Sequence, residues 1–233
     1  MCNRSAPEVK AVAFDAVGTL LFPDPPAGRV YAEAARRHGS PPLDPADIER
    51  RFRTAFAAEE ARDREAGWRT DAARERRRWR AIVAASLPEV ADPDACFDEL
   101  FAHFARPGAW RTPPGTAEVL GDLARRGTKV IVASNYDARL RDVVRGLPAL
   151  GAVGGLVISS EVGWRKPAPE FFRAVADRAG CAPGEVLFVG DDPENDFRAA
   201  SQAGMRAVLY DPGGQHPSVA PRVRALTDLL RFI

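Results

Sequence analysis

Short apolar segments alternate with amphipathic ones over most of the chain. The apolar segments have the length of single strands: 9–14, KVIVAS (129–134), GGLVISS (154–160), EVLFVGD (185–191) and RAVLYD (206–211). Mostly apolar strands are typical of a parallel sheet that is covered on both faces. Between them lie segments with helical spacing, at 116–126, 137–145, 169–179 and 194–203, and a last helix is expected from Pro221. This alternation predicts an α/β fold in which a parallel sheet lies between two layers of helices.

The stretch from residue 28 to about residue 105 has a different pattern, with Arg-, Ala- and Glu-rich segments of helical spacing. Asp-Pro pairs at 44–45 and 92–93 each place a capping carboxylate before a proline at the first helical position. We therefore expect three or four helices and no strands here, inserted after the first strand. The predicted organisation is a core of residues 1–22 and 109–233 and a helical insertion of residues 23–108.

Polar side chains follow the ends of the predicted strands. They are Asp15, Ser134, Asn135, Asp191 and Asp192, with Lys166 and Asp196 a few residues beyond a strand. Ligands of a doubly wound sheet bind at the carboxyl ends of its strands, so we expect these side chains to surround one cleft. Each close pair of carboxylates there would repel by roughly 4 kcal/mol at an effective dielectric of about 20. Such a cluster requires a cation.

Oxygen ligands without His or Cys favour Mg²⁺, which binds carboxylates together with water and a substrate phosphate. Lys166 would add a second positive charge, and Pro167 favours an extended backbone that directs this lysine outward. Ser134 and Asn135 lie between a strand end and a helix start, where a hydroxyl and backbone N–H groups can bind an anion. The expected partner is therefore a small, phosphorylated substrate.

Overall charge gives no reason to expect a macromolecular ligand. The 233 residues contain 33 Lys and Arg against 32 Asp and Glu, so no net field attracts nucleic acid or an anionic membrane. The basic run RERRRWR at 74–80 has acidic residues beside it and is interpreted as a solvated helix face. No apolar run is long enough to cross a bilayer. We expect neither nucleic acid nor membrane as a partner.

Cysteine usage favours a reducing compartment. Cys2, Cys96 and Cys181 are odd in number and widely spaced, without a CxxC pair, so neither a disulfide framework nor a zinc site is predicted. The first ten residues also lack the apolar segment of a signal peptide. A cytoplasmic monomer or homodimer is expected.

Four segments taken together resemble the motifs of a known family. FDAVGTL (14–20), VIVASN (130–135), GWRKPAP (163–169) and VGDDPENDFRAASQAGM (189–205) are similar, in order and in spacing, to the four motifs of the haloacid dehalogenase (HAD) superfamily. The resemblance implies a hydrolase with a three-layer Rossmann-like core, and the helical insertion is similar to that family's C1 cap.

The resemblance also implies a role for each motif residue. Asp15 would be the nucleophile, which the transferred group joins as an aspartyl intermediate. Lys166 would neutralise the nucleophile and the substrate. Asp191 would bind Mg²⁺ together with Asp15 and the backbone carbonyl of Val17. The remaining assignments are Ser134 and Asn135 for holding the transferred group, and Asp192 and Asp196 for completing or orienting the metal's ligands.

Val17 departs from the phosphatase motif of the family, which has an Asp at this position as general acid. The family's 2-haloacid dehalogenases have an apolar or aromatic residue there, because a halide leaves without a proton. The acidic fourth motif, Gly190-Asp191-Asp192, instead resembles the metal-binding version that transfers phosphoryl groups. We therefore expect Mg²⁺-dependent phosphoryl hydrolysis. The alternatives are a metal-independent 2-haloacid dehalogenase and a catalytically weak binding or regulatory protein of the same fold.

Folding alone offers simpler roles for some of these residues. Asp15 could cap the turn that follows it, and the Ser134-Asn135 pair could be only a helix N-cap. The acids at 191, 192 and 196 could cap a helix that begins near Glu194. Capping accounts for one or two of these acids but not for all three.

Overall fold

A six-stranded parallel sheet forms the centre of the molecule. The structure, a computed structural model, describes residues 8–233, and within them the sheet has the order β5-β4-β1-β6-β7-β8 with only parallel ladders. The strands are β1 (Ala11–Phe14), β4 (Lys129–Ser134), β5 (Gly155–Ile158), β6 (Val186–Gly190), β7 (Arg206–Tyr210) and β8 (Arg222–Val223). Strand β1 lies in the middle, between β4 and β6. The α/β fold expected from the alternating pattern is confirmed.

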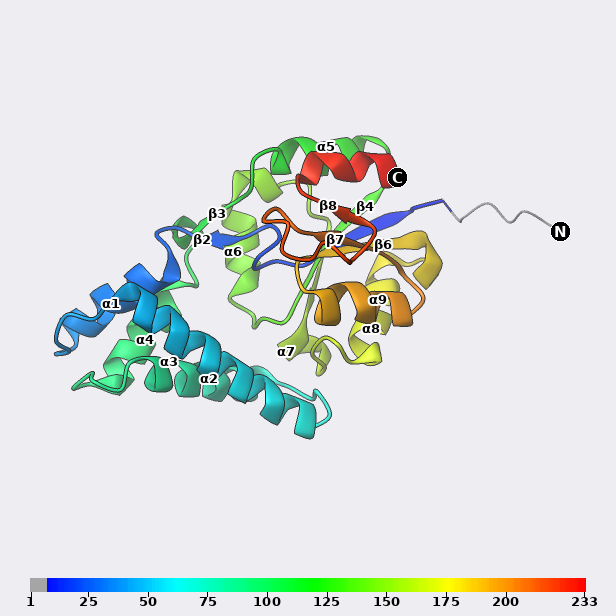
Figure 1. Ribbon diagram of the computed structural model, residues 1–233. Helices are drawn as coiled ribbons and strands as arrows, with labels where there is room; N and C mark the ends of the chain where they lie inside the picture. The colour runs from blue at the N-terminus through cyan, green and yellow to red at the C-terminus, as the bar shows by residue number, and fades with distance from the viewer. Residues whose placement is uncertain (1–7) are drawn as a thin grey trace.

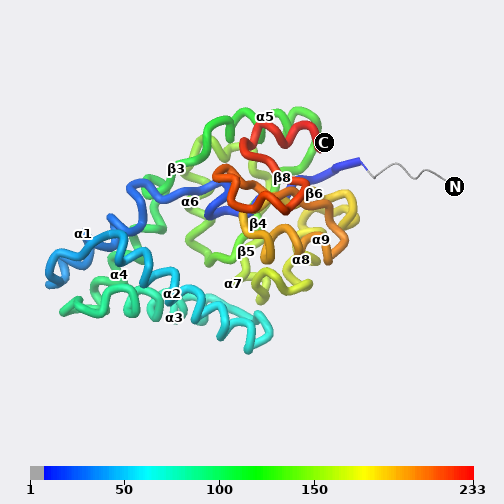
Figure 2. Tube along the Cα trace, viewed as in Figure 1, coloured from blue at the N-terminus to red at the C-terminus, as the bar shows by residue number. Residues whose placement is uncertain are grey.

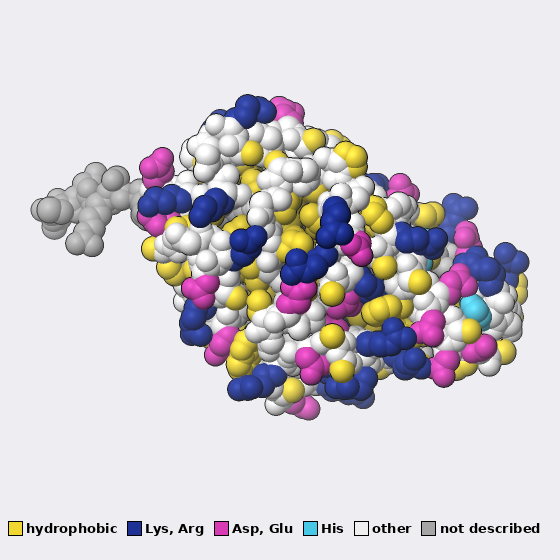
Figure 3. All heavy atoms as spheres, turned by 180° about the vertical axis from the view of Figure 1, so that it is seen from behind, with side chains coloured by type: hydrophobic (Ala, Val, Ile, Leu, Met, Phe, Trp, Pro, Cys, Tyr) yellow, Lys and Arg dark blue, Asp and Glu magenta, His cyan; other side chains and the backbone are white. Residues whose placement is uncertain are grey.

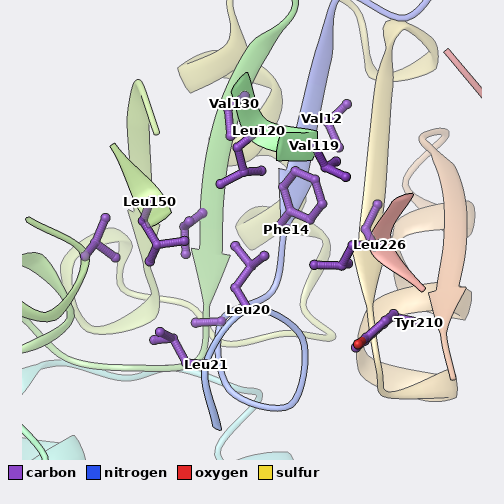
Figure 4. Packing of buried hydrophobic residues seen from close by; sticks show 14 of the residues in the cluster. Val12, Phe14, Leu20, Leu21, Val119, Leu120, Val130, Leu150, Tyr210 and Leu226 are labelled. Carbon is purple, nitrogen blue, oxygen red and sulfur yellow. The ribbon is translucent and has the colours of Figure 1, made fainter. Parts of the chain in front are cut away.

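Helices cover both faces of this sheet, which gives three layers (Figure 1). One face packs against α5 (Thr116–Arg125), α6 (Leu140–Gly146) and a C-terminal 3-10 helix (Leu226–Phe232), and the other against α8 (Pro169–Ala179) and α9 (Ala199–Gln202). Alternate residues of β1 point to opposite faces. Val12 and Phe14 lie among Val119, Leu120 and Leu226 (Figure 4), whereas Ala11 and Ala13 join the cluster formed with α8. The strands are thus apolar on both sides because both sides are buried.

Four helices follow β1 and lie to one side of the sheet (Figures 1 and 2). They are α1 (Ala27–Arg37), α2 (Pro45–Glu65), α3 (Ala72–Ser86) and α4 (Pro93–His103). Asp44 and Asp92 accept hydrogen bonds from the backbone N–H groups of Ala46 (2.9 Å) and Ala95 (3.0 Å). The two predicted Asp-Pro caps are therefore confirmed. The helices share a buried cluster of their own, which includes Val30, Ile48, Val83, Phe97 and Leu100.

Two short strands join the helical segment to the sheet. The chain leaves through β2 (Phe22–Pro23) and returns through β3 (Trp110–Arg111), which pair antiparallel. Next to them the N–H of Asp24 donates to the carbonyl of Ala109 at 2.9 Å. The outgoing and returning segments are thereby held side by side, at the two ends of the helical insertion.

The last helix predicted from Pro221 is wrong. Residues Arg222–Val223 form β8 instead, because Leu209 donates its N–H to the carbonyl of Pro221 (3.0 Å) and Asp211 donates to that of Val223 (2.8 Å). Only a 3-10 helix follows, at Leu226–Phe232. Residues 222–223 pair with β7, which would otherwise be an open edge of the sheet. The local sequence pattern carries no information on such pairing.

Two other elements differ in detail from the prediction. The segment 154–160 leaves the sheet after Ile158, and Ser159 opens the short helix α7 (Ser159–Val162) with its hydroxyl donating to the carbonyl of Tyr136 at 3.0 Å. The helix expected at 194–203 divides into a π-helical part, Pro193–Arg198, and the α-helix α9. A π-turn in a helix is often found at a functional site.

The face of the molecule seen in Figure 3 shows no large patch of one sign of charge. On the face seen in Figure 3, acidic and basic side chains are interspersed. Within residues 8–233 no helix combines the length and the apolar character needed to span a membrane.

Candidate active site

Three neighbouring strands deliver polar side chains to one point. Asp15 directly follows β1 and donates its N–H to the carbonyl of Val189 in β6 at 2.8 Å. Ser134 is the last residue of β4, and Asp191 directly follows β6. Because β4 and β6 flank β1, the three side chains meet at the carboxyl edge of the sheet, where the sequence placed them.

Lys166 lies between two of the carboxylates. Its Nζ donates to Oδ1 of Asp15 at 2.6 Å and to Oδ1 of Asp196 at 2.5 Å, and the residue is only 2% exposed. Burial acts to lower the pKa of Lys166, but the charges of Asp15 and Asp196 outweigh it and raise the pKa above its ordinary value. The lysine is therefore a fixed cation.

Asn135 holds the backbone of this lysine. Its Oδ1 accepts from the N–H of Lys166 at 2.7 Å, and its Nδ2 donates to the carbonyl of the same residue at 3.0 Å. This paired contact positions Lys166 from the end of β4.

Ser134, by contrast, is 3% exposed and lines the cleft, and its hydroxyl makes no hydrogen bond with residues 8–233. It is free to bind a ligand.

Both oxygens of Asp196 are occupied. Oδ1 binds Lys166, and Oδ2 accepts from the N–H of Asp192 at 3.0 Å. A Cβ at Gly190 would lie 2.2 Å from Oδ2 of Asp196, so only glycine lets this carboxylate approach the strand end. The side chain of Asp192 caps the π-helical turn, where its Oδ1 accepts from the N–H of Glu194 at 2.8 Å. Asp192 thus holds Asp196 through its backbone N–H, and Asp196 in turn binds Lys166.

Asp191 is the carboxylate least compensated by a cation. Its Oδ1 accepts from the hydroxyl of Thr19 at 3.1 Å, a contact that sequence reasoning missed although Thr19 lies within the first motif. Burial, followed by the charges of Asp15 and Asp196, raises the pKa of Asp191 to about 7. Gly18 makes room for it: φ is +99°, and a Cβ there would lie 2.4 Å from Oδ2 of Asp191. Gly18 therefore leaves space for the carboxyl group of Asp191, whose raised pKa disfavours ionisation.

The three carboxylates could hold a divalent cation. Asp15, Asp191 and Asp196 each offer one oxygen, and these oxygens all lie within 4.8 Å of one another. One ammonium group faces three carboxylates, so negative charge remains in excess when all are ionised. Because both oxygens of Asp196 already have donors, Asp15 and Asp191 are the residues with oxygens to spare. The donor set fits Mg²⁺, which prefers carboxylate and water oxygens.

A cavity of about 400 Å³ extends from these carboxylates toward the helices α1–α4. Val17 lies on its wall and, among the described residues, is the one large apolar side chain that is strongly exposed, at 39%. Nine aromatic side chains also line the cavity: Tyr31, Phe52, Phe56, Trp79, Phe97, Phe101, Phe104, Trp110 and Tyr136. Sequence reasoning did not find this lining, because its members are brought together by tertiary packing.

The loop that carries Lys166 is bonded to the helical insertion. Arg165 forms ion pairs with Glu75 and with Asp63, whose Oδ2 lies 3.4 Å from its Nε, and all three are buried. The N–H of Arg165 also donates to the carbonyl of Trp68 at 2.9 Å. The residue before the lysine therefore connects the active-site loop to α2, α3 and the turn between them.

Known sequences identify the family of this chain. The sequence profile of the haloacid dehalogenase-like hydrolases matches residues 9–204, which is most of the chain. The protein belongs to the haloacid dehalogenase-like hydrolase family.

Proteins similar to this chain carry the names of more than one kind of enzyme. Haloacid dehalogenase-like hydrolase domain-containing protein 3 of Mus musculus is 29% identical over 207 residues, covering 87% of this chain and 82% of that protein. A phosphoserine phosphatase of Thermus thermophilus is 35% identical over 114 residues, or 48% of this chain and 46% of that protein. The solved structure of the L-2-haloacid dehalogenase RSc1362 has a TM-score of 0.76 at 20% identity and covers 97% of this chain and 99% of that one. Similarity alone does not choose between phosphatase and dehalogenase.

Removing the charge of Asp191 should stabilise the metal-free protein. Between roughly pH 4 and pH 7 the folded state keeps a proton that the unfolded chain has released, so stability falls as pH rises through this window. Asp191→Asn keeps an oxygen for Thr19 and removes this cost. In EDTA at about pH 8 we expect the variant to have a higher melting temperature than wild type and a free energy of unfolding that is larger by ~1–2 kcal/mol. This gain in stability should shrink near pH 4.5.

Asp211→Asn is the matched control. Burial acts to raise the pKa of Asp211, but hydrogen bonds from the N–H groups of His216 and Gln215 outweigh it and lower the pKa. The same substitution should therefore destabilise the protein at pH 8. A loss of stability in Asp191→Asn as well would mean that the active-site carboxylates do not repel one another as described.

Proposed function

We propose that this hydrolase removes a phosphoryl group from a small phosphorylated molecule, with Asp15 as nucleophile and Mg²⁺ as cofactor. The observation that carries the proposal is the excess of carboxylates around one lysine. A phosphate dianion could not approach Asp15, Asp191 and Asp196 unless a cation offset their charge. A 2-haloacid dehalogenase that works without metal has no need for this excess. The partial similarity to a phosphoserine phosphatase supports the same choice.

In the first step Asp15 attacks phosphorus. Lys166 donates to Oδ1 of Asp15 and so fixes the orientation of this carboxylate, of which one oxygen attacks phosphorus and the other is available to Mg²⁺. The new bond from Asp15 to phosphorus forms as the ester bond on its opposite side breaks, and the leaving oxygen departs with the bonding electrons. In the second step a water molecule attacks phosphorus, which releases inorganic phosphate and restores the carboxylate of Asp15.

The other motif residues serve the same transfer in this proposal. Lys166 and the hydroxyl of Ser134 bind the transferred phosphoryl oxygens, and Asn135 keeps the lysine in place. Asp15, Asp191 and the carbonyl of Val17 would hold Mg²⁺, while Asp192 and Asp196 orient its surroundings. Bound there, Mg²⁺ would neutralise charge on the phosphoryl oxygens. Since Val17 has no proton to give, the leaving group departs as an anion and then takes a proton from the solvent.

The helical insertion is the cap in this proposal. Residues 1–22 and 109–233 form the catalytic core, and residues 23–108 close over Asp15, with the β2–β3 pair as the connection between them. Arg165 then links cap position to the loop of Lys166. We place the protein in the cytoplasm, as a monomer or homodimer acting on a small molecule.

Val17 favours a second candidate, a metal-independent 2-haloacid dehalogenase. Asp15 would then displace halide from carbon, and no proton donor would be required. The two reactions differ in metal dependence and in the product that is released.

Mg²⁺ should raise both melting temperature and phosphatase activity. A ligand present at about 100 times its dissociation constant stabilises the folded state by roughly 2.7 kcal/mol, which is ~5–10 °C for a chain of this size. The shift should be larger at about pH 8 than at pH 5, because protons compete for Asp191 below its raised pKa. Asp191→Ala should lose the shift, and Asp211→Ala should keep it.

A metal-independent dehalogenase would give a different result. Halide release from 2-chloropropionate in EDTA, with no Mg²⁺-dependent change in melting or in phosphate ester hydrolysis, would replace the phosphatase proposal by the dehalogenase one.

Val17→Asp should restore a general acid and change leaving-group preference. A missing general acid costs about 10²- to 10⁴-fold in rate, and most for a leaving group that holds its proton tightly. Wild type should therefore hydrolyse a nitrophenyl phosphate far better than an alkyl phosphate, and the variant should narrow the gap by accelerating the alkyl ester. The measurement is kcat/KM for both esters in both proteins, with Val17→Asn as the isosteric control. Equal rates for the two esters in wild type would show that another residue donates the proton.

A further inference from the structure

We propose that the substrate is an aryl phosphate, in which a flat, uncharged aromatic ring system is the leaving group. This inference rests on the proposed function and adds the chemical class of the group that departs. Three properties of the cleft carry it: the aromatic lining of the cavity, the internal pairing of its charged side chains, and the apolar residue at Val17.

The cavity wall beyond the carboxylates is aromatic. Its nine rings come both from the helical insertion, as with Phe52, and from the core, as with Tyr136. Several of them already contact one another at the offset or tilted geometry typical of ring pairs, such as Phe104 and Trp110 with centroids 5.6 Å apart. A volume of about 400 Å³ is suited to a ring system and exceeds the needs of a two- or three-carbon acid.

The charged side chains of the wall are satisfied within the protein. Arg139 donates to Asp137 through Nε (2.8 Å) and Nη2 (2.7 Å) and to the carbonyl of Phe101 through Nη1 (2.9 Å). Its guanidinium also lies 3.4 Å from the centroid of the Phe101 ring. This arginine is therefore a neutralised part of the wall and leaves little charge for a ligand.

The other two ionised groups of the wall also have partners within the protein, although only Arg165 has partners of opposite charge. Arg165 pairs with Asp63 and Glu75, and Glu60 accepts a hydrogen bond from Nδ2 of Asn195 at 2.9 Å. A leaving group with an anionic substituent would have to be desolvated in this cavity without a free cation and near the carboxylate of Glu60, which is costly. An uncharged one meets no such penalty.

The apolar side chain of Val17 independently favours an aryl leaving group. Without a proton donor beside the ester oxygen, the leaving group must depart as an anion, and a phenolate is a far more stable anion than an alkoxide. Phosphoserine fails on both counts, since it carries an amino and a carboxylate group and leaves as an alkoxide. An aromatic ring attached directly to the ester oxygen satisfies the cavity and the missing acid together.

The first test separates aromaticity from leaving-group acidity. Hexafluoroisopropanol and phenol have similar acidity, so their phosphate esters differ mainly in the ring. With Mg²⁺, we expect kcat/KM for phenyl and naphthyl phosphate to exceed that for hexafluoroisopropyl phosphate by at least the roughly 10- to 200-fold that a single methylene group can contribute in a hydrophobic pocket. Equal values for the three esters would overturn the proposal while leaving the phosphatase function intact.

The second test locates the ring in the cavity. Ala27 lines the cavity at the start of α1, and Ala57 is exposed on α2 outside it. Ala27→Phe should fill the space and lower the ratio of naphthyl to hexafluoroisopropyl hydrolysis at least tenfold, and Ala57→Phe should leave the ratio unchanged. An unchanged ratio in a folded Ala27→Phe variant would contradict the assignment.

A binding measurement keeps this inference separate from the proposed function. Calorimetry with naphthylmethylphosphonate, which cannot be hydrolysed, should show binding at least tenfold tighter than with methylphosphonate, and Ala27→Phe should remove the difference. If no phosphate ester is hydrolysed but this difference is present, the phosphatase function fails and the aromatic site stands. If phosphonates bind without regard to the ring, the aromatic site fails whatever the activity.

Discussion

The ammonium group of Lys166, held between Asp15 and Asp196, is the interaction on which the rest of the site depends. It fixes one oxygen of Asp15 at 2.6 Å and leaves the other for chemistry. Its support comes from three directions: Asn135 binds its backbone, Asp196 binds its Nζ at 2.5 Å, and Arg165 ties the same loop to the helices above. A buried cation so firmly placed gives Asp15, the proposed nucleophile, a fixed orientation.

The lysine compensates only part of the acidic charge around it. Asp191 has a neutral donor in Thr19 and no cationic partner of its own, and its pKa is raised accordingly. On this imbalance rests the proposal that the site binds a divalent cation and, through the cation, phosphate. Val17 would limit which leaving groups can depart, since it offers no proton to the departing oxygen. In the proposed reaction the aromatic cavity beyond it would then determine which leaving group can be accommodated.

The parts of this structure that sequence could predict are those governed by local rules. Parallel strands end at one edge, so the meeting of Asp15, Ser134 and Asp191 followed from the alternating pattern alone, and the two Asp-Pro caps followed from helix-end chemistry. The strand at Arg222–Val223 and the cavity lining depend on pairing and packing between distant segments, which no local pattern encodes. The contacts of Thr19 and Arg165 were likewise hidden, although both residues lie within recognised motifs.

Covalent catalysis by Asp15 can be tested by following the chemical state of this residue during turnover. The protein is mixed with naphthyl phosphate and Mg²⁺, quenched in acid within a single turnover and reduced with borohydride, which converts an aspartyl phosphate to homoserine; peptide mass spectrometry then locates the change. The account predicts that position 15 is converted, only when both substrate and Mg²⁺ are present, and that Asp191 and Asp196 are untouched. Turnover with Asp15 unmodified, or modification at another aspartate, would contradict it.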